Sequence, residues 1–171
     1  MTKSSITTLQ AYSNADCAGS CDVRRSTGGF AIYLGNNIIS WSTNKKPTVA
    51  RSSTEAEYRD MANVIIELFW LQLLLKELGI KLAAASILWC DNIGATYLSC
   101  NPVFKAWSKR IECDYYFVRK QASQKFMQVS FISNEDQLAD IFTKSLFRQR
   151  FMEIRGRIRL INKPWYSAVF S

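Results

Sequence analysis

A series of short strands that leads into one long helix is the feature that most constrains how this chain folds. Apolar and β-branched residues alternate in the strand segments, and Gly35-Asn36-Asn37 is typical of a hairpin turn. Helical spacing then continues up to Gly79, a residue type that commonly ends helices. The strands are predicted at residues 7–13, 30–34 and 38–42, and the helix at residues 53–78. The sequence therefore predicts an antiparallel meander followed by a long helix.

The rest of the chain alternates between further strands and helices. Strands are predicted at residues 86–90 and 126–132, and helices at residues 92–99, 108–121, 136–146 and 148–160. The pattern fades from Asn162 onward, where an irregular tail is expected. This order predicts a single α/β domain in which the later strands join the sheet of the meander through helices.

The long helix carries specific signals at its start and along its length. Ser52 with Glu55, and Thr54 with Glu57, both match the spacing of a capping box. The residues that define its apolar period are Ala62, Ile65, Ile66, Phe69 and Leu73, with Lys76 as a further candidate.

The composition is that of one globular domain. The chain has 171 residues, of which 48% are hydrophobic and 21% are charged, which is enough for a sizeable core. No apolar run reaches the roughly 18 residues that a membrane span needs, and residues 1–10 lack the apolar core of a secretory signal. Five cysteines without a CxxC pair favour reduced thiols and an intracellular location, in the cytoplasm or the nucleus.

The absence of histidine restricts the possible chemistry. It excludes Ser-His-Asp and Cys-His mechanisms and every imidazole metal site, so any catalysis must use carboxylates, lysine, tyrosine or cysteine. The net charge of +8 favours a polyanionic partner, nucleic acid first. A merely soluble basic protein remains the alternative. The basic residues concentrate in two clusters, at residues 105–125 and 148–163.

Three carboxylates stand where one sheet could bring them together. Asp91 follows a predicted strand, where it could either bind a metal or cap the next helix. Glu57 lies in the first turn of the long helix, where it could pair with Thr54 unless Ser52 already supplies the cap. Asp140, taken alone, is typical of a solvated surface acid. Taken together, three such acids are what two Mg²⁺ ions need for phosphodiester hydrolysis.

Several motifs are similar to those of one known family. They are Tyr12-Ser-Asn-Ala-Asp16, Arg25-Ser-Thr-Gly-Gly-Phe30, Ser40-Trp-Ser42, Ser52-Ser-Thr-Glu-Ala-Glu-Tyr58, Cys90-Asp-Asn92, Asn101-Pro-Val-Phe104, Gln137-Leu-Ala-Asp-Ile141 and Thr143-Lys144. Over residues 8–155 the chain resembles the ribonuclease H domain of copia-type LTR retrotransposon polyproteins. The resemblance predicts a ribonuclease H-like domain at residues 8–155 and a basic, irregular tail at residues 156–171.

The resemblance implies a fold, an activity and a set of site residues. The fold has a five-stranded mixed sheet, an antiparallel meander and then parallel strands, flanked by helices. The activity is hydrolysis of the RNA strand of RNA/DNA hybrids with two Mg²⁺ or Mn²⁺ ions, beside a reverse transcriptase domain in the parent polyprotein. By matching motifs, Asp91 and position 14 would be the central metal ligands. Glu57 would complete one metal site and orient the attacking water, and Asp140 would complete the other.

One position of this acidic set departs from the family. Aspartate is usual where this chain has Asn14, and an amide cannot bridge two cations as a carboxylate does. We therefore expect a loss of several kcal/mol in metal and transition-state stabilisation. Asp16 shares a strand face with position 14 but lies about 7 Å farther along, so it could substitute only if the backbone moved. Three interpretations stay open: an impaired nuclease, a non-catalytic nucleic-acid binding module, and a decayed fragment of an element.

Basic residues would contact the nucleic acid in the first two interpretations. The candidates are Lys45, Lys46, Arg51, Lys105, Lys109 and Arg110. For each of them alone, ordinary solvated charge is an equal alternative. Trp41 lies near the expected groove, and Tyr115-Tyr116 could stack on bases, although tyrosines at helical spacing are more often core. We expect a monomer whose partner is an RNA/DNA hybrid or another nucleic acid.

Overall fold

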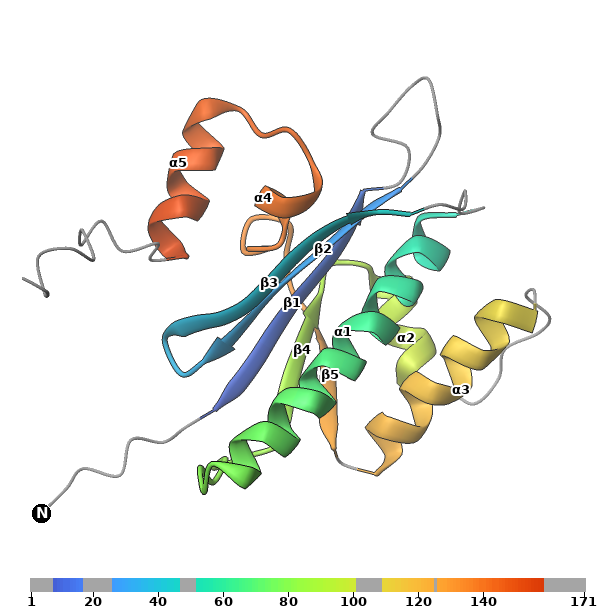
Figure 1. Ribbon diagram of the computed structural model, residues 1–171. Coiled ribbons are helices and arrows are strands. Elements are labelled where there is room, and N and C mark those ends of the chain that lie inside the picture. The colour runs from blue at the N-terminus through green and yellow to red at the C-terminus, as the bar shows by residue number, and fades with distance from the viewer. Residues whose placement is uncertain (1–7, 17–25, 47–51, 101–108, 125, 159–171) are drawn as a thin grey trace, which may run out of the picture.

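The computed structural model describes residues 8–16, 26–46, 52–100, 109–124 and 126–158 (Figure 1). The elements are β1 (Leu9–Asp16), β2 (Thr27–Leu34), β3 (Asn37–Lys45), α1 (Ser53–Glu77), β4 (Ser86–Cys90), α2 (Ile93–Cys100), α3 (Lys109–Ser123), β5 (Met127–Phe131), α4 (Asp140–Thr143) and α5 (Arg148–Arg157). Their order and types confirm the predicted sequence of strands and helices. The largest difference is α4, which is a single turn where a helix over 136–146 was predicted.

All five strands form one mixed sheet with the order β3-β2-β1-β4-β5. The strand β1 pairs antiparallel with β2, and β2 pairs antiparallel with β3. On its other side β1 pairs parallel with β4, and β4 pairs parallel with β5. The expected fold, an antiparallel meander that parallel strands join through helices, is therefore confirmed.

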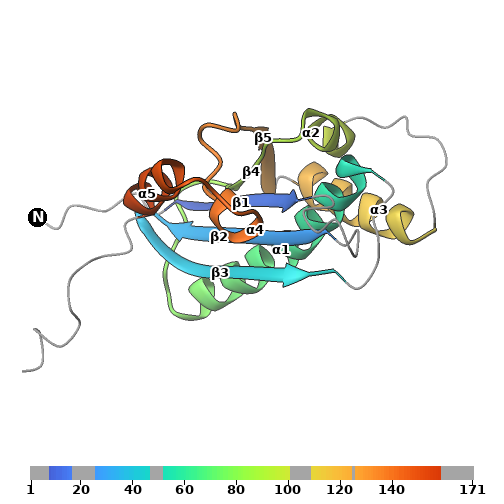
Figure 2. The ribbon, with the colours of Figure 1, turned by 90° about the horizontal axis from the view of Figure 1, so that it is seen from above.

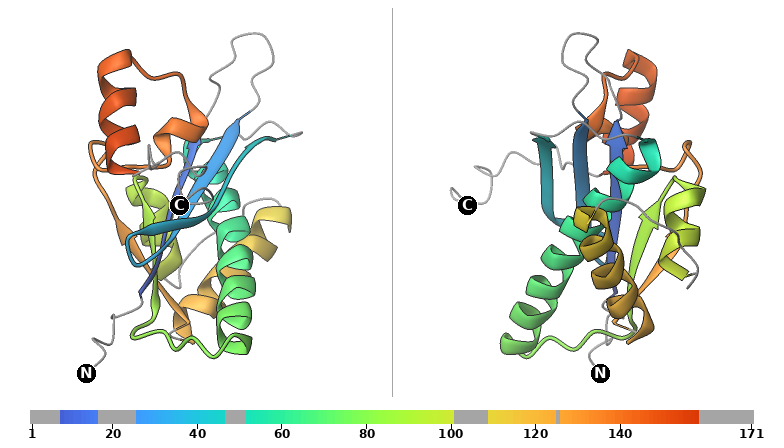
Figure 3. Two further views of the ribbon diagram at one scale, coloured as in Figure 1. Left: turned by 60° about the vertical axis from the view of Figure 1, so that its left-hand side comes forward. Right: turned by 90° about the vertical axis from the view of Figure 1, so that its right-hand side faces the viewer.

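Helices cover both faces of the sheet (Figures 2 and 3). On one face, α1 packs against β1 and β2, with α2 and α3 beside it. On the other face, α4 packs against β2 and α5 packs against α4, and Ile154 of α5 joins Ala31 and Leu138 in a second buried cluster. The helix α5 reaches Arg157, and Ile158 after it is 1% exposed, so this second cluster continues beyond the boundary expected at residue 155.

The face of α1 that is buried agrees only in part with the face that its apolar period predicted. Ala62 and Ile65 are buried as that period requires, but Ile66, Phe69 and Leu73 are exposed. The residues that face the sheet follow a row that includes Tyr58, Met61, Ile65, Leu68 and Leu75. The helix is apolar on nearly every side, so spacing alone could not identify the side that the sheet covers.

Two consecutive glycines in β2 allow helices to approach the sheet closely from both faces. A Cβ atom at Gly28 would collide with the carboxylate of Asp60 on α1. A Cβ atom at Gly29 would lie 2.8 Å from Cβ of Phe142 and 2.9 Å from a methyl carbon of Thr143, both on α4. These glycines therefore determine how closely α1 and α4 pack against the sheet. Within the described ranges, no helix has the length and apolar character that crossing a bilayer requires.

Candidate active site

Three acidic residues and one asparagine meet at one edge of the sheet. Because β1 and β4 are parallel neighbours, Asn14 near the end of β1 and Asp91 just after β4 lie at the same edge. Glu57 comes to this edge in the first turn of α1, and Asp140 is the first residue of α4. Asn14, Glu57 and Asp140 are each 3% exposed, so the edge is a buried polar centre and not a solvated surface.

Glu57 is not used as a helix cap. The side chain of Ser52 caps α1, because its Oγ accepts a hydrogen bond from the backbone N–H of Glu55 at 3.1 Å. Glu57 instead turns towards β1, where its Oε1 accepts a hydrogen bond from the backbone N–H of Ala15 at 2.7 Å. That bond fixes the carboxyl group beside the strand that carries Asn14.

Asp91 is also free of a capping role. Asn92 caps the next helix, because its Oδ1 accepts a hydrogen bond from the backbone N–H of Ala95 at 2.9 Å. Ligand atoms of Glu57, Cys90 and Asp91 all lie within 4.8 Å of one another, and the Cys90 Sγ is 3.9 Å from Oε2 of Glu57. Two carboxylates at this separation are hard oxygen donors of the kind that divalent cations bind.

Asp140 is a buried acid, so the interpretation of it as a solvated surface residue is wrong. Asn14 donates a hydrogen bond from Nδ2 to Oδ1 of Asp140 at 2.5 Å and another to Oγ1 of Thr143 at 3.0 Å. The ammonium group of Lys144 lies 2.8 Å from the same Oδ1. One amide and one ammonium therefore already stabilise the carboxylate of Asp140.

The electrostatics of this centre disfavour negative charge in the absence of a cation. Burial, followed by the charge of Asp91, raises the pKa of Glu57 to about 9. Burial and the nearby Asp140 raise the pKa of Asp91 as well. Burial also raises the pKa of the Cys90 thiol. Neighbouring acids that raise one another's pKa values are expected where a bound divalent cation supplies the compensating charge. The residues present therefore fit a bound divalent metal.

Asp16 does not join this cluster. It is the last residue of β1, beyond the residue whose N–H binds Glu57. Within the part of the chain that the structure describes, the carboxylate and thiol group that could hold a metal comprises Glu57, Cys90 and Asp91, without Asp16.

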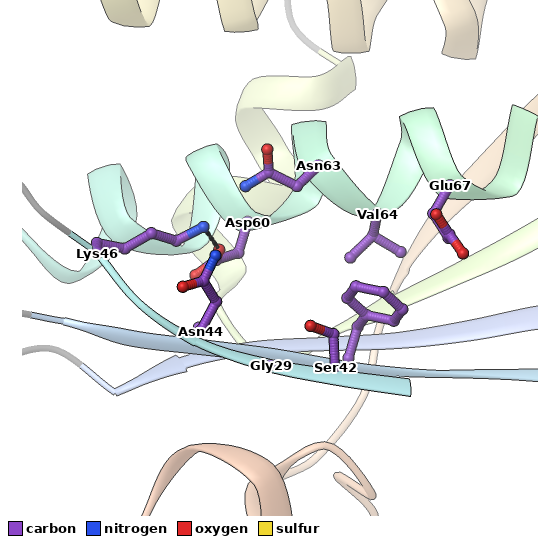
Figure 4. A pocket seen from close by; sticks show the side chains of 10 residues that line it. Gly29, Ser42, Asn44, Lys46, Asp60, Asn63, Val64 and Glu67 are labelled. Carbon is purple, nitrogen blue, oxygen red and sulfur yellow. Dashed lines mark ion pairs between the residues drawn. The ribbon is translucent and has the colours of Figure 1, made fainter. Parts of the chain in front are cut away.

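The basic residues predicted to contact nucleic acid differ in their exposure and in their partners. Lys45 is exposed at the end of β3, as a phosphate contact requires. Lys46 instead forms an ion pair with Asp60 on α1 (Figure 4), and the two side chains are only 16% and 6% exposed. Arg51 and Lys105 lie outside the described residues. Lys109 and Arg110 begin α3, but their side chains are not among those described.

Three residues within the matched motifs support the site through contacts that sequence reasoning did not predict. Lys144 neutralises Asp140, and the i,i+4 spacing of the two residues was a signal for this pair. Gln137 is fully buried, and its Nε2 donates to the carbonyl oxygen of Ser13 at 2.9 Å, which joins the segment before α4 to β1. Thr143 accepts the second hydrogen bond of Asn14. No local pattern indicates the last two contacts, because each joins segments more than 120 residues apart.

Sequence comparison places the chain among transposon polyproteins. It is 48% identical over 162 residues to the retrovirus-related Pol polyprotein from transposon RE2 of Arabidopsis thaliana, and 46% identical to that from transposon RE1. It is 34% identical over 143 residues to the Pol polyprotein from transposon TNT 1-94 of Nicotiana tabacum. The first two alignments cover 95% of this chain, which spans only 11% of the length of those relatives. No protein-family model matches the chain.

Solved structures with the same fold are RNase H domains. The N-terminal RNase H domain of a Mycobacterium tuberculosis protein superposes with a TM-score of 0.58 at 11% identity, over 88% of this chain and 97% of that one. LC11-RNase H1, solved in complex with an RNA/DNA hybrid, gives a TM-score of 0.57 at 13% identity, over 79% and 93% of the two chains. At these identities the likeness shows the fold alone.

Proposed function

Because this chain is a ribonuclease H-like domain homologous to a segment of the Pol polyproteins of copia-type transposons, we propose that it binds RNA/DNA hybrids and hydrolyses their RNA strand slowly. The observation that carries this proposal is the convergence of Glu57, Asp91 and Asp140 on one sheet edge around a neutral Asn14. The acids suit phosphodiester hydrolysis, and the amide lowers its rate.

Each residue has a definable task in this proposal. Glu57 and Asp91 would hold the divalent metal, which when bound activates a water and stabilises the leaving oxygen. We take the metal to be Mg²⁺ or Mn²⁺, because the ligands are carboxylate oxygens. The N–H of Ala15 orients Glu57. Asn14 donates a hydrogen bond to the carboxylate of Asp140, and Lys144 forms an ion pair with it. Both interactions would make Asp140 a weaker ligand for a second cation.

The test is cleavage of a labelled RNA/DNA hybrid by the native chain, Asn14→Asp and Asn14→Asp/Asp91→Asn. We expect Asn14→Asp to cut at least 100-fold faster with Mg²⁺, because a carboxylate at position 14 completes the set of four acidic ligands; this corresponds to about 2.7 kcal/mol in the barrier. The double variant should cut no faster than background. Equal rates for the native chain and Asn14→Asp would show that position 14 does not limit hydrolysis.

A second readout does not depend on turnover. In Asn14→Asp, two buried carboxylates would face each other without the present hydrogen bond from Nδ2. The variant should therefore unfold at lower temperature than the native chain in EDTA, and Mg²⁺ should raise its Tm more than it raises the native Tm. A Tm that Mg²⁺ raises equally in both proteins would contradict the proposed ligand role of position 14.

Hybrid binding without cleavage is the second candidate function. It is favoured by the metal-free stabilisation of Asp140, which Asn14 and Lys144 provide between them. A pure binding module would hold the hybrid with an affinity that falls steeply with salt and would give no product at any Mg²⁺ concentration, even after Asn14→Asp.

A further inference from the structure

The outer side of α1 carries a continuous row of exposed apolar side chains, which we call the α1 stripe. It comprises Ile66, Phe69, Trp70, Leu73, Leu74 and Leu78. These side chains are between 39% and 65% exposed, and they follow one another at helical spacing along the C-terminal half of α1. Single exposed apolar residues are ordinary, but a contiguous row of large ones marks a surface that another molecule covers.

The charges beside the stripe argue against nucleic acid as its partner. Between Ile66 and Leu78 the helix carries Glu67, Lys76 and Glu77, which give no net positive charge. A surface that binds phosphates needs lysines or arginines in excess. A covering surface must instead be apolar, as in the fully buried part of a protein interface.

The stripe lies at the same end of the molecule as the start of β1. Leu9, which begins β1, belongs to the same buried cluster as Leu71 and Leu75 of α1. The start of β1 and the C-terminal end of α1 therefore lie at the same end of the molecule (Figures 1 and 3). The helix α5, by contrast, lies on the opposite face of the sheet (Figure 2). β1 thus begins at the end of the molecule that carries the stripe.

We propose that the α1 stripe docks the part of the Pol polyprotein that precedes this domain. The relatives are about nine times longer than the segment that this chain matches, so other polyprotein domains are available to cover the stripe. A domain that is tethered beside the stripe has a high effective concentration there, so even a weak apolar contact would form. The proposal does not depend on hydrolysis.

The test uses the 171-residue chain and, as the probe, the purified portion of the transposon RE2 polyprotein that precedes the aligned segment. The stripe variant is Ile66→Gln/Trp70→Gln, one helical turn apart. The matched control is Trp41→Gln, because Trp41 is 60% exposed on β3 and pairs with Ala31, whose side chain belongs to the cluster on the other face. Circular dichroism and thermal unfolding establish that all three proteins fold.

We expect the native chain and Trp41→Gln to bind the probe equally, and the stripe variant to bind at least tenfold more weakly. In oxidative footprinting, Trp70 should lose reactivity on binding while Trp41 keeps it. Hybrid binding and cleavage by the isolated stripe variant should equal those of the native chain, which separates this test from that of the proposed function.

Three outcomes would overturn the proposal. The first is a native chain that does not bind the probe, and the second is a stripe variant that binds it as well as the native chain does. The third is a native chain that forms a dimer by light scattering and becomes monomeric in the stripe variant, because a second copy would then be the occupant.

Discussion

At the scale of single residues, Glu57 is the group whose charge depends most on what occupies the site. Its carboxyl is 3% exposed and receives one backbone hydrogen bond, from Ala15. Burial and the charge of Asp91 raise its pKa from 4.5 to about 9. At neutral pH the metal-free protein therefore holds Glu57 protonated, and a bound cation must displace that proton.

This shift predicts how stability depends on pH in EDTA. Because the folded-state pKa of Glu57 lies above its unfolded value, its favourable contribution is complete below pH 4.5 and is lost as pH rises towards about 9. Glu57→Gln mimics the protonated acid. It should be more stable than the native chain at pH 8.5 by on the order of 1 to 3 kcal/mol, and nearly equal to it at pH 5. Urea denaturation at the two pH values measures the difference.

The exposed Glu77→Gln serves as the control and should leave the pH dependence unchanged. Mg²⁺ should stabilise the native chain but not Glu57→Gln. A native stability that does not fall between pH 5 and 8.5 would mean that Glu57 ionises normally.

Single residues also show what sequence reasoning could and could not provide. The family resemblance named Asn14, Glu57, Asp91 and Asp140, and in the structure Asn14, Glu57 and Asp91 lie at one edge of the sheet. The resemblance did not show that Asp140 is buried, because its burial depends on contacts with Asn14 and Lys144 that only the folded sheet creates. Residues that lie far apart along the chain give no local signal of such pairing.

At the scale of elements, the junction between β3 and α1 depends on one buried ion pair. Lys46 follows β3 directly, and its ammonium group pairs with Asp60 one turn after Glu57 (Figure 4). Burial raises the pKa of Asp60, and Lys46 opposes that shift. This pair therefore ties the edge strand to the helix that positions the active-site acid.

The pair predicts opposite outcomes for two adjacent lysines. Lys46→Met should destabilise the protein by about 2 to 4 kcal/mol, because it leaves the Asp60 charge buried without its partner. Lys45→Met, at an exposed position, should change stability by less than about 0.5 kcal/mol, and it should reduce the salt dependence of hybrid binding. Denaturation and binding titrations on the two variants provide the comparison. Equal losses of stability in the two variants would show that the ion pair between Lys46 and Asp60 does not contribute to stability.

Elements differ in how well their limits follow from sequence. The strand at 86–90 and the start of α1 were predicted correctly, because an apolar run and a capping serine mark them. The end of β1 was predicted too early, at Ser13, because Asn14 and Asp16 are polar and resemble a turn. The helix predicted at 136–146 is only one turn long in the structure, because the hydrogen bond from Gln137 to Ser13 holds the preceding segment in an irregular conformation.

At the scale of the whole molecule, the sheet separates two layers with different tasks. The layer of α1 contains most of the core, whereas the smaller layer of α4 and α5 carries Asp140. Ile154, which is fully buried, packs this smaller layer on the sheet, and Arg157 joins α5 to the segment before α4 through Asp136, 2.8 Å away. The acid Asp140 therefore depends on the packing of α5 for its position.

Removing this packing should affect both stability and catalysis. Ile154→Ala should destabilise the protein by about 2 to 4 kcal/mol, because it leaves a cavity under α5. Met152→Ala, at a 45% exposed position of the same helix, should cost less than about 1 kcal/mol. If Asn14→Asp cuts the hybrid as proposed, adding Ile154→Ala to it should lower hybrid cleavage under folding conditions. Full activity in that double variant would show that α5 does not position Asp140.

The contact between Asn14 and Asp140 joins residues 126 positions apart, and this separation has a consequence for synthesis. A ribosome makes β1 before α4. Until the segment through α5 has emerged, Glu57 of α1 and Asp91 after β4 can come together beside β1 without Asp140. Translation thus assembles the acidic site in two stages, and Asp140 joins Asn14 only in the second.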